Sequence, residues 1–280
     1  MTSPLVDSTW LAAHLDDPRV RIADVRWYLS GKSGADEYAR GHLPGALFVD
    51  LGRDLAAGGT SGPGRHPLPT AAGFAAALSR LGVTRETLIV AYDDAGGSIA
   101  ARLWWLLRYF GHGGGRVLDG GIGAWIAAGH PLSTDTPAVA PTPLLDLAPA
   151  RALSVDKAEV DRLRRLPGVV LLDARAADRF EGRVEPVDAR AGHIPGARSA
   201  PYAGNLDEAG GLRPAAELTA RYAALGALGA ETVVCYCGSG VTACHDLLAL
   251  SIAGRDDALL YEGSWSDWAR DPALPAATGA

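Results

Sequence analysis

The 280-residue sequence has few cysteines and no long apolar run. Its three cysteines, Cys235, Cys237 and Cys244, lie close together, and an odd, clustered set does not resemble the disulfide framework of a secreted domain. No window approaches the roughly 18 apolar residues that span a bilayer, and Met1 to Leu15 lacks the pattern of a signal peptide. We therefore expect a soluble, cytoplasmic protein without a membrane partner.

Positive charge is also scarce. The net charge is −6 and the isoelectric point is near 5.6, so no basic stripe suggests a nucleic-acid partner. The glycine-rich segment Gly120-Gly121-Ile122-Gly123 lacks the full pattern of a dinucleotide-binding loop, and we interpret it as a turn before a helix. The length suits one large domain or two ordinary ones.

The chain contains an internal duplication. Four short motifs recur in the second half, in the same order and at nearly constant spacing. They are Asp24-Val25-Arg26 and Asp173-Ala174-Arg175, Gly41–Ala46 and Gly192–Ala197, Leu88–Tyr92 and Thr232–Tyr236, and Gly120 with Trp125 against Gly263 with Trp268. Such a long period predicts two domains rather than a solenoid. Residues 136–150 are rich in Pro and Ala, so we predict a linker there between domains at 1–135 and 151–280.

Each copy has the pattern of an α/β domain. Residues 169–172 and 231–236 are short runs rich in β-branched and apolar residues, typical of strands buried on both faces. Residues 241–253 are mostly apolar and suit a helix packed on a sheet. Strands that alternate with helices predict, in each domain, a small, mainly parallel sheet flanked by helices. Ligands bind beyond the carboxyl ends of such strands, which directs attention to the residues after Tyr236.

A cysteine follows this strand directly. The loop is Cys237-Gly238-Ser239-Gly240-Val241-Thr242. Its glycines permit a tight turn in which backbone N–H groups converge, and the N-terminus of the following helix favours negative charge. The pattern predicts a stabilised thiolate and a cradle for a persulfide anion. The alternative is a buried, inert cysteine beside a structural turn.

This loop resembles the active-site loop of the 3-mercaptopyruvate sulfurtransferases, tandem-domain relatives of thiosulfate sulfurtransferase (rhodanese). The resemblance covers nearly the whole chain, including the repeated Gly-His-x-Pro-Gly-Ala motif and residues 261–268. It implies two rhodanese-like domains, of which only the C-terminal one carries the nucleophile. The residues agree, because Asp93 stands opposite Cys237 when Tyr92 is aligned with Tyr236. We expect the first domain to be catalytically silent and to form one wall of the site.

The resemblance implies a sulfur transfer in two steps. The thiolate of Cys237 attacks the outer sulfur of a small anionic donor, which leaves a Cys237 persulfide and pyruvate or sulfite. A thiol or cyanide then removes that sulfur, and a thioredoxin-like protein is a candidate reductant. The loop amides would stabilise the developing negative charge. Neither a metal nor an organic cofactor is required.

The donor's acidic group calls for arginine. Arg179 occupies the place of the family's substrate-binding arginine, and its guanidinium suits a carboxylate or sulfonate. The alternative is a solvated surface charge. A second family arginine, in a Glu-Pro-Arg segment, is replaced by Val187. Arg183 and Arg190 are candidates for that role, although neither is in register.

Ser239 resembles the family's loop serine, which is proposed to work with a histidine and an aspartate from the first domain. His66 falls at the histidine position, whereas the aspartate position holds Gly52, with Asp50 and Asp54 nearby. A complete relay is therefore not predicted, and His66 fits a plain loop residue equally well.

Other repeated polar residues favour a structural role. His42 and His193 recur in both copies, as do Arg26 and Arg175. Because one copy is expected to be silent, we predict that the two histidines hold turns through hydrogen bonds, and that the arginines have a similar role.

Two other kinds of cysteine site fit poorly. A cysteine phosphatase needs an arginine six positions after the nucleophile, where this chain has Ala243. A metal site could be counted from Cys235, Cys237, Cys244 and His245, but no second paired cluster has zinc-like spacing. We therefore predict no metal.

The donor and the protein class leave alternatives open. Gly238 and Ser239 bring no positive charge beside the cysteine, which favours mercaptopyruvate, whereas Val187 argues against it. A thiosulfate:cyanide sulfurtransferase is the alternative enzyme. A module that only relays or binds a protein persulfide is the alternative of another class. We expect a monomer.

Overall fold

The computed structural model describes residues 3–58 and 62–280, which form two compact units. The N-terminal unit comprises Met1–Ala57, Pro69–Ala150 and Asp207–Leu212. The C-terminal unit comprises Gly58–Leu68, Arg151–Leu206 and Arg213–Ala280. Each unit therefore includes a short segment from the other half of the chain.

The N-terminal unit is built on a five-stranded parallel sheet with the strand order β1-β5-β4-β2-β3. Its strands are β1 (Leu5–Val6), β2 (Val20–Asp24), β3 (Ala46–Phe48), β4 (Leu88–Tyr92) and β5 (Gly115–Leu118). Its helices are α1 (Ser8–Ala12), α2 (Gly34–Arg40), α3 (Leu51–Asp54), α4 (Ala71–Arg80), α5 (Ala100–Tyr109) and α6 (Gly121–Ala127). Strands β2 and β4 are inner strands of the sheet, and four of the five residues of each are buried.

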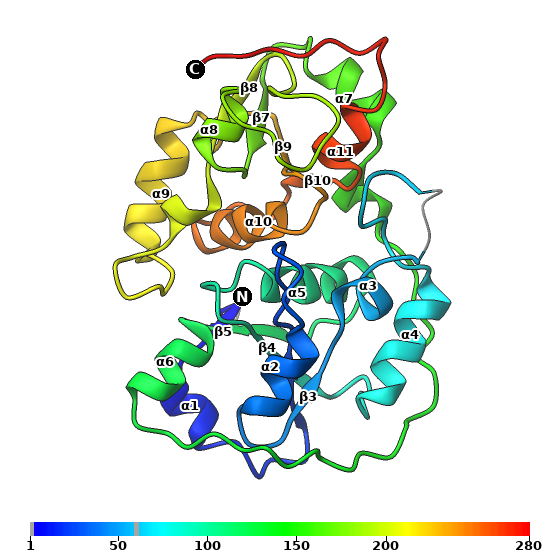
Figure 1. Cartoon of the computed structure of the whole chain (residues 1–280), viewed down its shortest axis with the longest axis vertical. Helices are drawn as coiled ribbons and strands as arrows, with labels where there is room; N and C mark the ends of the chain where they lie inside the picture. The colour runs from blue at the N-terminus through cyan, green and yellow to red at the C-terminus, as the bar shows by residue number, and fades with distance from the viewer. Residues whose placement is uncertain (1–2, 59–61) are drawn as a thin grey trace. The chain divides into compact units, whose positions relative to one another are not determined.

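Helices cover both faces of this sheet. Ile22 and Tyr92 point to the face where Leu11 of α1 and Trp125 of α6 complete one core cluster. Helices α1 and α6 lie next to each other in Figure 1. On the other face, α5 packs on β4 and β5. The inner strands are therefore buried over most of their length, although β2 carries Arg21 and β5 carries Arg116.

The C-terminal unit repeats this topology with the strand order β6-β10-β9-β7-β8, again all parallel. Its strands are β6 (Ser154–Val155), β7 (Val169–Asp173), β8 (Ala197–Ser199), β9 (Thr232–Tyr236) and β10 (Leu259–Tyr261). Its helices are α7 (Lys157–Leu163), α8 (Ala177–Phe180), α9 (Ala215–Ala224), α10 (Ala243–Ile252) and α11 (Ser264–Trp268), with short 3₁₀ turns at Arg151–Leu153 and Tyr202–Asn205.

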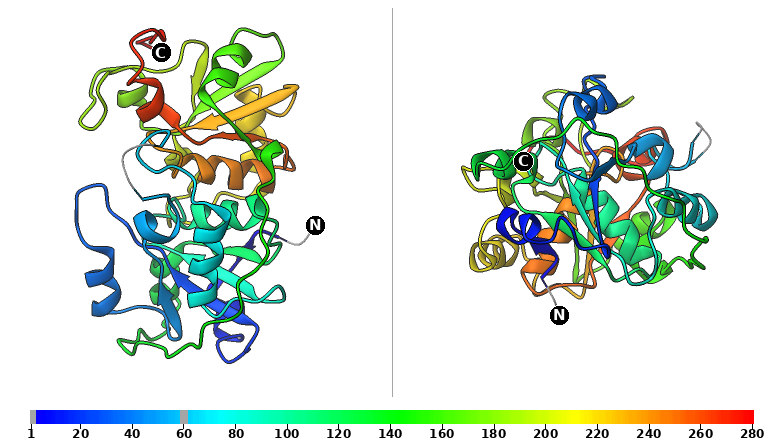
Figure 2. Two further views of the ribbon diagram at one scale, coloured as in Figure 1. Left: turned by 90° about the vertical axis from the view of Figure 1, so that its right-hand side faces the viewer. Right: turned by 90° about the horizontal axis from the view of Figure 1, so that it is seen from below.

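The same division of faces recurs in this unit. Val160 of α7 and Trp265 of α11 join Val234 and Tyr236 in one buried cluster. On the opposite face α10 packs on β9 and β10 and contacts α9. Figures 1 and 2 show α10 lying along the sheet of this unit. The predicted fold class, two parallel-sheet α/β domains flanked by helices, is therefore confirmed.

The repeated arginines and histidines are buried turn-holding residues in both units. Arg26 binds Asp24 and the carbonyl of Gly41, and Arg175 binds Asp173 and the carbonyl of Gly192. The ring of His42 bonds the carbonyl of Tyr38, and that of His193 bonds the carbonyl of Phe180. These contacts agree with the structural roles predicted from their repetition.

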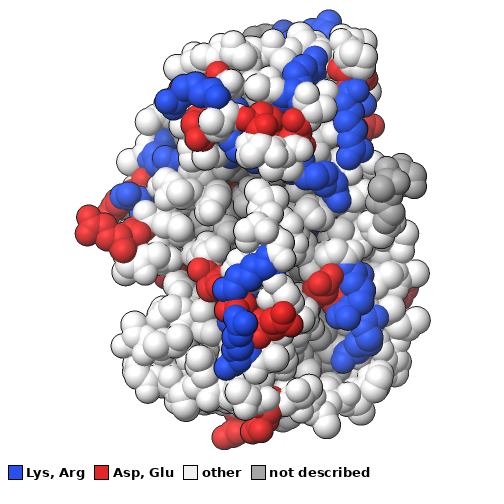
Figure 3. All heavy atoms as spheres, in the orientation of Figure 1, with Lys and Arg blue, Asp and Glu red and all other residues white. Residues whose placement is uncertain are grey.

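None of the helices in the described part of the chain is long and apolar enough to cross a membrane. On the face shown in Figure 3, basic side chains are interspersed with acidic ones in small clusters.

Candidate functional site

Cys237 is the first residue after β9, at the carboxyl end of a central strand. It is buried, with 2% of its surface exposed. Its carbonyl accepts a hydrogen bond from the N–H of Trp265 at 2.9 Å, and the carbonyl of Gly238 accepts one from Ser266 at 2.9 Å. These bonds attach the start of the loop to the first turn of α11 and determine the position of the cysteine.

The rest of the loop turns sharply into α10. Gly240 has a φ of 76°, and a Cβ there would lie 2.5 Å from the carbonyl oxygen of Glu262, so only glycine fits. The carbonyls of Val241 and Thr242 accept hydrogen bonds from the N–H groups of Cys244 and His245, each at 3.1 Å. The predicted strand–loop–helix arrangement is present.

The matching loop of the N-terminal unit shows what such a loop can bind. Asp93 follows β4 as Cys237 follows β9, and its carbonyl accepts the N–H of Ile122 at 3.0 Å, as that of Cys237 accepts Trp265. The Asp93 carboxyl group is fully buried and accepts four backbone N–H groups at 2.8–2.9 Å. Burial raises the pKa of Asp93, and these four donors oppose the rise by favouring the carboxylate.

Ser264 holds the backbone of Cys237 from the start of α11. Its hydroxyl accepts a hydrogen bond from the N–H of Cys237 at 3.1 Å and donates one to the carbonyl of Tyr261 at 2.9 Å. Among the described residues other than glycine, Ser264 alone has a positive φ, 52°. Such a conformation costs about 1–3 kcal/mol and is maintained only when surrounding contacts require it. The matching residue of the N-terminal unit is Gly121, with a φ of 56°.

Ser264 is a residue of the site that was not predicted from the sequence. The repeat alignment contained a signal that could have found it, because serine replaces glycine at an otherwise matched position.

Arg179, on α8, lies over the loop. Its guanidinium pairs with Glu185 at 2.6 Å and with Asp188 at 3.1 Å. A Cβ built on Gly238 would lie 3.6 Å from its Nη1 atom. Although burial alone would raise the pKa of Glu185, the N–H of Asp188 and the Arg179 guanidinium lower it overall. The side chain is only 15% exposed, which disagrees with a solvated surface charge.

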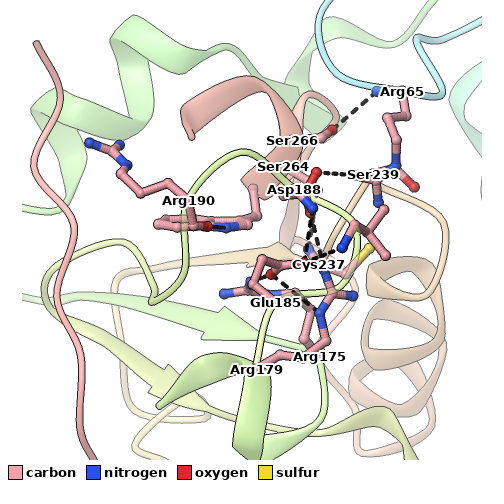
Figure 4. A network of polar contacts seen from close by, with 12 residues as sticks. Arg65, Arg175, Arg179, Glu185, Asp188, Arg190, Cys237, Ser239, Ser264 and Ser266 are labelled. Carbon is pink, nitrogen blue, oxygen red and sulfur yellow. Dashed lines mark hydrogen bonds and ion pairs between the residues drawn. The ribbon is translucent and has the colours of Figure 1, made fainter. Parts of the chain in front are cut away.

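A second guanidinium comes from Arg65, which the sequence reasoning did not single out. Arg65 belongs to the segment Gly58–Leu68 of the C-terminal unit. Its N–H bonds the hydroxyl of Ser266 at 3.1 Å, and its Nη1 atom pairs with Asp188. Its Nη2 atom would lie 2.9 Å from a Cβ on Gly238. Figure 4 shows Arg65 and Arg179 approaching the start of the loop from different elements.

Arg183 and Arg190, the candidates to replace the second substrate-binding arginine of the family, do not contact the cysteine loop in the way that Arg65 and Arg179 approach it. The side chain of Arg183 is 64% exposed and pairs with Glu181. The Arg190 guanidinium lies 5.9 Å from the ring centroid of Trp265 and donates a hydrogen bond to the carbonyl of Leu274. Figure 4 shows it extending away from Cys237. Neither side chain is directed at the loop in the way that Arg65 is.

The structure brings His66 and Ser239 together. The Nδ1 atom of His66 lies 2.8 Å from the hydroxyl oxygen of Ser239, within hydrogen-bonding distance. The aspartates considered for a relay are engaged within the N-terminal unit. Asp50 caps α3 by accepting the N–H of Arg53, and Asp54 pairs with the Arg53 guanidinium.

The other two cysteines occupy different environments. Cys235 lies inside β9, and burial raises the pKa of its thiol well above the ordinary value. Cys244 lies on α10, and its thiol donates to the carbonyl of Gly240 at 3.4 Å. None of the three cysteines forms a disulfide. Across residues 3–58 and 62–280, no group of three or more His, Cys, Asp or Glu side chains is arranged to hold a metal ion.

The tandem parallel sheets and the cysteine loop at the end of β9 have the arrangement that the resemblance to tandem-domain sulfurtransferases implied. Comparison with known protein families agrees, because the rhodanese-like domain matches residues 7–128 and again residues 156–271. The chain therefore belongs to the rhodanese-like family, with two such domains in tandem.

Individual relatives lie within the same enzyme class. A Pseudomonas aeruginosa protein named "Probable 3-mercaptopyruvate sulfurtransferase" is 44% identical over 99% of this chain and 99% of its own. The thiosulfate sulfurtransferase of Bos taurus is 34% identical over 94% of this chain and 91% of its own. The crystal structure of SseA from Escherichia coli, a 3-mercaptopyruvate sulfotransferase, matches with a TM-score of 0.83 and 34% identity, and covers 95% of this chain and 100% of that one. These relatives identify this protein as a sulfurtransferase.

Proposed function

We propose that this sulfurtransferase moves a sulfur atom from 3-mercaptopyruvate, through a persulfide on Cys237, to a thiol or cyanide acceptor. The observation that carries the proposal is the loop after β9. It presents Cys237 directly after a central strand, as the longer loop of the N-terminal unit presents Asp93, whose carboxyl group accepts four N–H groups. A glycine-containing loop that leads into a helix suits a thiolate, and equally a persulfide anion.

In the first step the Cys237 thiolate attacks the donor sulfur. A sulfur–sulfur bond forms and the carbon–sulfur bond of mercaptopyruvate breaks, and its electron pair remains on the carbon as the enolate of pyruvate. That enolate takes up a proton to give pyruvate. In the second step an acceptor thiolate or cyanide attacks the outer sulfur of the persulfide, which releases the Cys237 thiolate unchanged.

The charged and polar side chains around the loop have separate roles in this reaction. The guanidiniums of Arg65 and Arg179 bind the donor carboxylate, because both have a terminal nitrogen near Gly238. The Ser239 hydroxyl, which lies 2.8 Å from Nδ1 of His66, would deliver the proton to the enolate. Ser264 keeps the Cys237 backbone in position.

Thiosulfate is the second candidate donor. The two guanidiniums at the loop would also donate hydrogen bonds to the sulfonate group of thiosulfate, and the bovine relative is named for this substrate. The remaining alternative is a module that takes its persulfide from a protein and acts on neither small donor.

The proposal extends to the surroundings of the enzyme. We propose a cytoplasmic monomer whose persulfide is removed by a low-molecular-weight thiol or a thioredoxin-like reductant. Three cysteines that form no disulfide are consistent with a reducing compartment. Size-exclusion chromatography with light scattering would test the oligomeric state.

Steady-state kinetics with both donors tests the function. We expect a higher kcat/KM for 3-mercaptopyruvate than for thiosulfate, and intact-protein mass spectrometry should show one added sulfur atom, located on Cys237 by peptide mapping. Faster turnover of thiosulfate would overturn the donor assignment. If both donors left Cys237 unmodified, the persulfide-relay alternative would replace the enzyme proposal.

A further inference from the structure

We propose that Asp188 is a specificity-determining residue, which favours a monoanionic sulfur donor over a dianionic one by placing a negative charge between the two guanidiniums at the loop. This inference rests on the proposed function and concerns the same site. It assigns a role to a residue that binds both arginines and is not itself part of the cysteine loop.

Asp188 bridges the two arginines. One carboxylate oxygen pairs with Nη1 of Arg65, and the other lies 3.1 Å from Nη2 of Arg179. The Asp188 side chain is only 4% exposed, so little water screens its charge. Figure 4 shows Asp188 between these arginines and close to the start of the loop.

The acidic residues bind only part of each guanidinium. Arg179 uses Nε and Nη2 to bind Glu185, and Nη2 also binds Asp188. The nitrogens nearest to Gly238 are the others, Nη2 of Arg65 at 2.9 Å and Nη1 of Arg179 at 3.6 Å from a Cβ built there. The carboxylates therefore orient the guanidiniums while leaving one terminal nitrogen of each directed at the loop.

The two arginines belong to a larger salt-bridge network without surplus positive charge. Arg179 is linked through Glu185 to Arg175, which also pairs with Asp173. The network thus contains three guanidiniums, those of Arg65, Arg175 and Arg179, and three carboxylates, those of Asp173, Glu185 and Asp188. A donor with one negative charge gains two N–H contacts at modest electrostatic cost. A second negative charge on the donor is repelled by Asp188 without a matching cation, and such repulsion is strong where water is scarce.

The substitution Asp188→Asn tests the charge itself, because asparagine keeps the size and one oxygen acceptor. We expect the ratio of kcat/KM for thiosulfate to that for 3-mercaptopyruvate to rise at least tenfold. If Asp188 only positioned the arginines, both donors would lose activity alike. An unchanged or lower ratio would therefore overturn the inference.

Glu181→Gln is the matched control. Glu181 follows α8 and pairs with the exposed Arg183, so this change removes one negative charge from the same region of the chain without altering the bridged arginines. The donor ratio should stay within about twofold of the wild type. A shift as large as that of Asp188→Asn would show a general charge effect and contradict the role of Asp188.

Arg65→Gln provides a second test that does not depend on the folding of the Asp188 variant. Arg65 is the more exposed partner in its pair, at 24%, so its loss should be tolerated. Removing one positive charge should lower the thiosulfate to mercaptopyruvate ratio at least tenfold, the opposite direction to Asp188→Asn. An equal loss for both donors would count against the inference. Failure of the wild type to form a persulfide with either donor would instead refute the proposed function.

Discussion

The loop after β4 begins with Asp93, whose side chain binds the backbone of the same loop, whereas the loop after β9 begins with the thiol of Cys237. In the N-terminal unit the Asp93 carboxyl group occupies the turn and satisfies four backbone N–H groups. In the C-terminal unit Cys237 also follows the strand directly, and its carbonyl accepts an N–H group of α11 as that of Asp93 accepts an N–H group of α6. The two loops also differ in length, because seven residues separate β4 from α5 and six separate β9 from α10. The longer loop is a structural turn filled by its own carboxyl group, whereas the shorter one presents a thiol.

A second difference accompanies the first. Gly121 supplies the positive φ in the N-terminal unit without strain, and a Cβ there would lie 2.2 Å from the carbonyl oxygen of Asp93. The C-terminal unit places Ser264 in nearly the same conformation and gains a hydroxyl that bonds Cys237. Strain retained at this position in only one unit indicates a functional reason for the serine.

Replacing the cysteine should have the largest effect. Cys237→Ser should lower sulfur transfer from either donor by at least about a thousandfold, because a hydroxyl neither ionises readily nor carries sulfane sulfur. Steady-state kinetics and mass spectrometry of the protein would measure this loss. Cys244→Ser, the control, should keep most of the activity. Equal losses in both variants would indicate a two-cysteine redox mechanism instead.

The next largest effect should be on stability. Asp93→Ala leaves four backbone N–H groups, three of them buried, without their acceptor and should lower the free energy of unfolding by about 3 kcal/mol. Cys237→Ala should lower it by about 1 kcal/mol, because it removes one small side chain. Urea denaturation monitored by circular dichroism would compare them. A loss for Asp93→Ala no larger than that for Cys237→Ala would contradict the contrast between a closed and an open loop.

The smallest expected effect separates the hydroxyl of Ser264 from its backbone conformation. Ser264→Ala and Ser264→Gly both remove the acceptor of the Cys237 N–H, and each should lower kcat about tenfold with little change in KM. Glycine also relieves the strain, so Ser264→Gly should be the more stable of the two. Full activity in Ser264→Gly would show that only the backbone conformation matters at this position.

Much of the fold and the core of the candidate site could be read from local patterns. The recurring motifs indicated a duplication, and the apolar runs indicated central parallel strands. Cys237 followed from its loop, because strand, glycine turn and helix start all lie within a few residues. Arg179 was proposed only through the family resemblance. Its guanidinium nitrogens lie 3.6 and 3.9 Å from a Cβ built on Gly238, and its binding of a donor stays a prediction.

The assignment of the remaining charged residues could not be made in this way. Arg183, Asp188 and Arg190 follow Arg179 by 4, 9 and 11 positions. Of the two arginines, Arg183 is exposed and Arg190 binds the carbonyl of Leu274, whereas Asp188 binds Arg179 itself. Arg65 and Asp188 are separated by 123 positions, and no local pattern joins them. His66 and Ser239, which are in contact, are separated by 173 positions. From the sequence, His66 fitted a partner of Ser239 and a plain loop residue equally well.

The sequence by itself determined the two parallel-sheet domains, the cysteine loop and the absence of a thiol in its N-terminal counterpart. These features depend on periodicity and on turn residues, which act over a few positions of the chain. Only the tertiary structure decided that Arg65 lies in the C-terminal unit, that Asp188 bridges it to Arg179, and that Ser264 holds the Cys237 backbone. Those contacts depend on where distant segments pack, and the packing is a property of the whole unit rather than of any one segment.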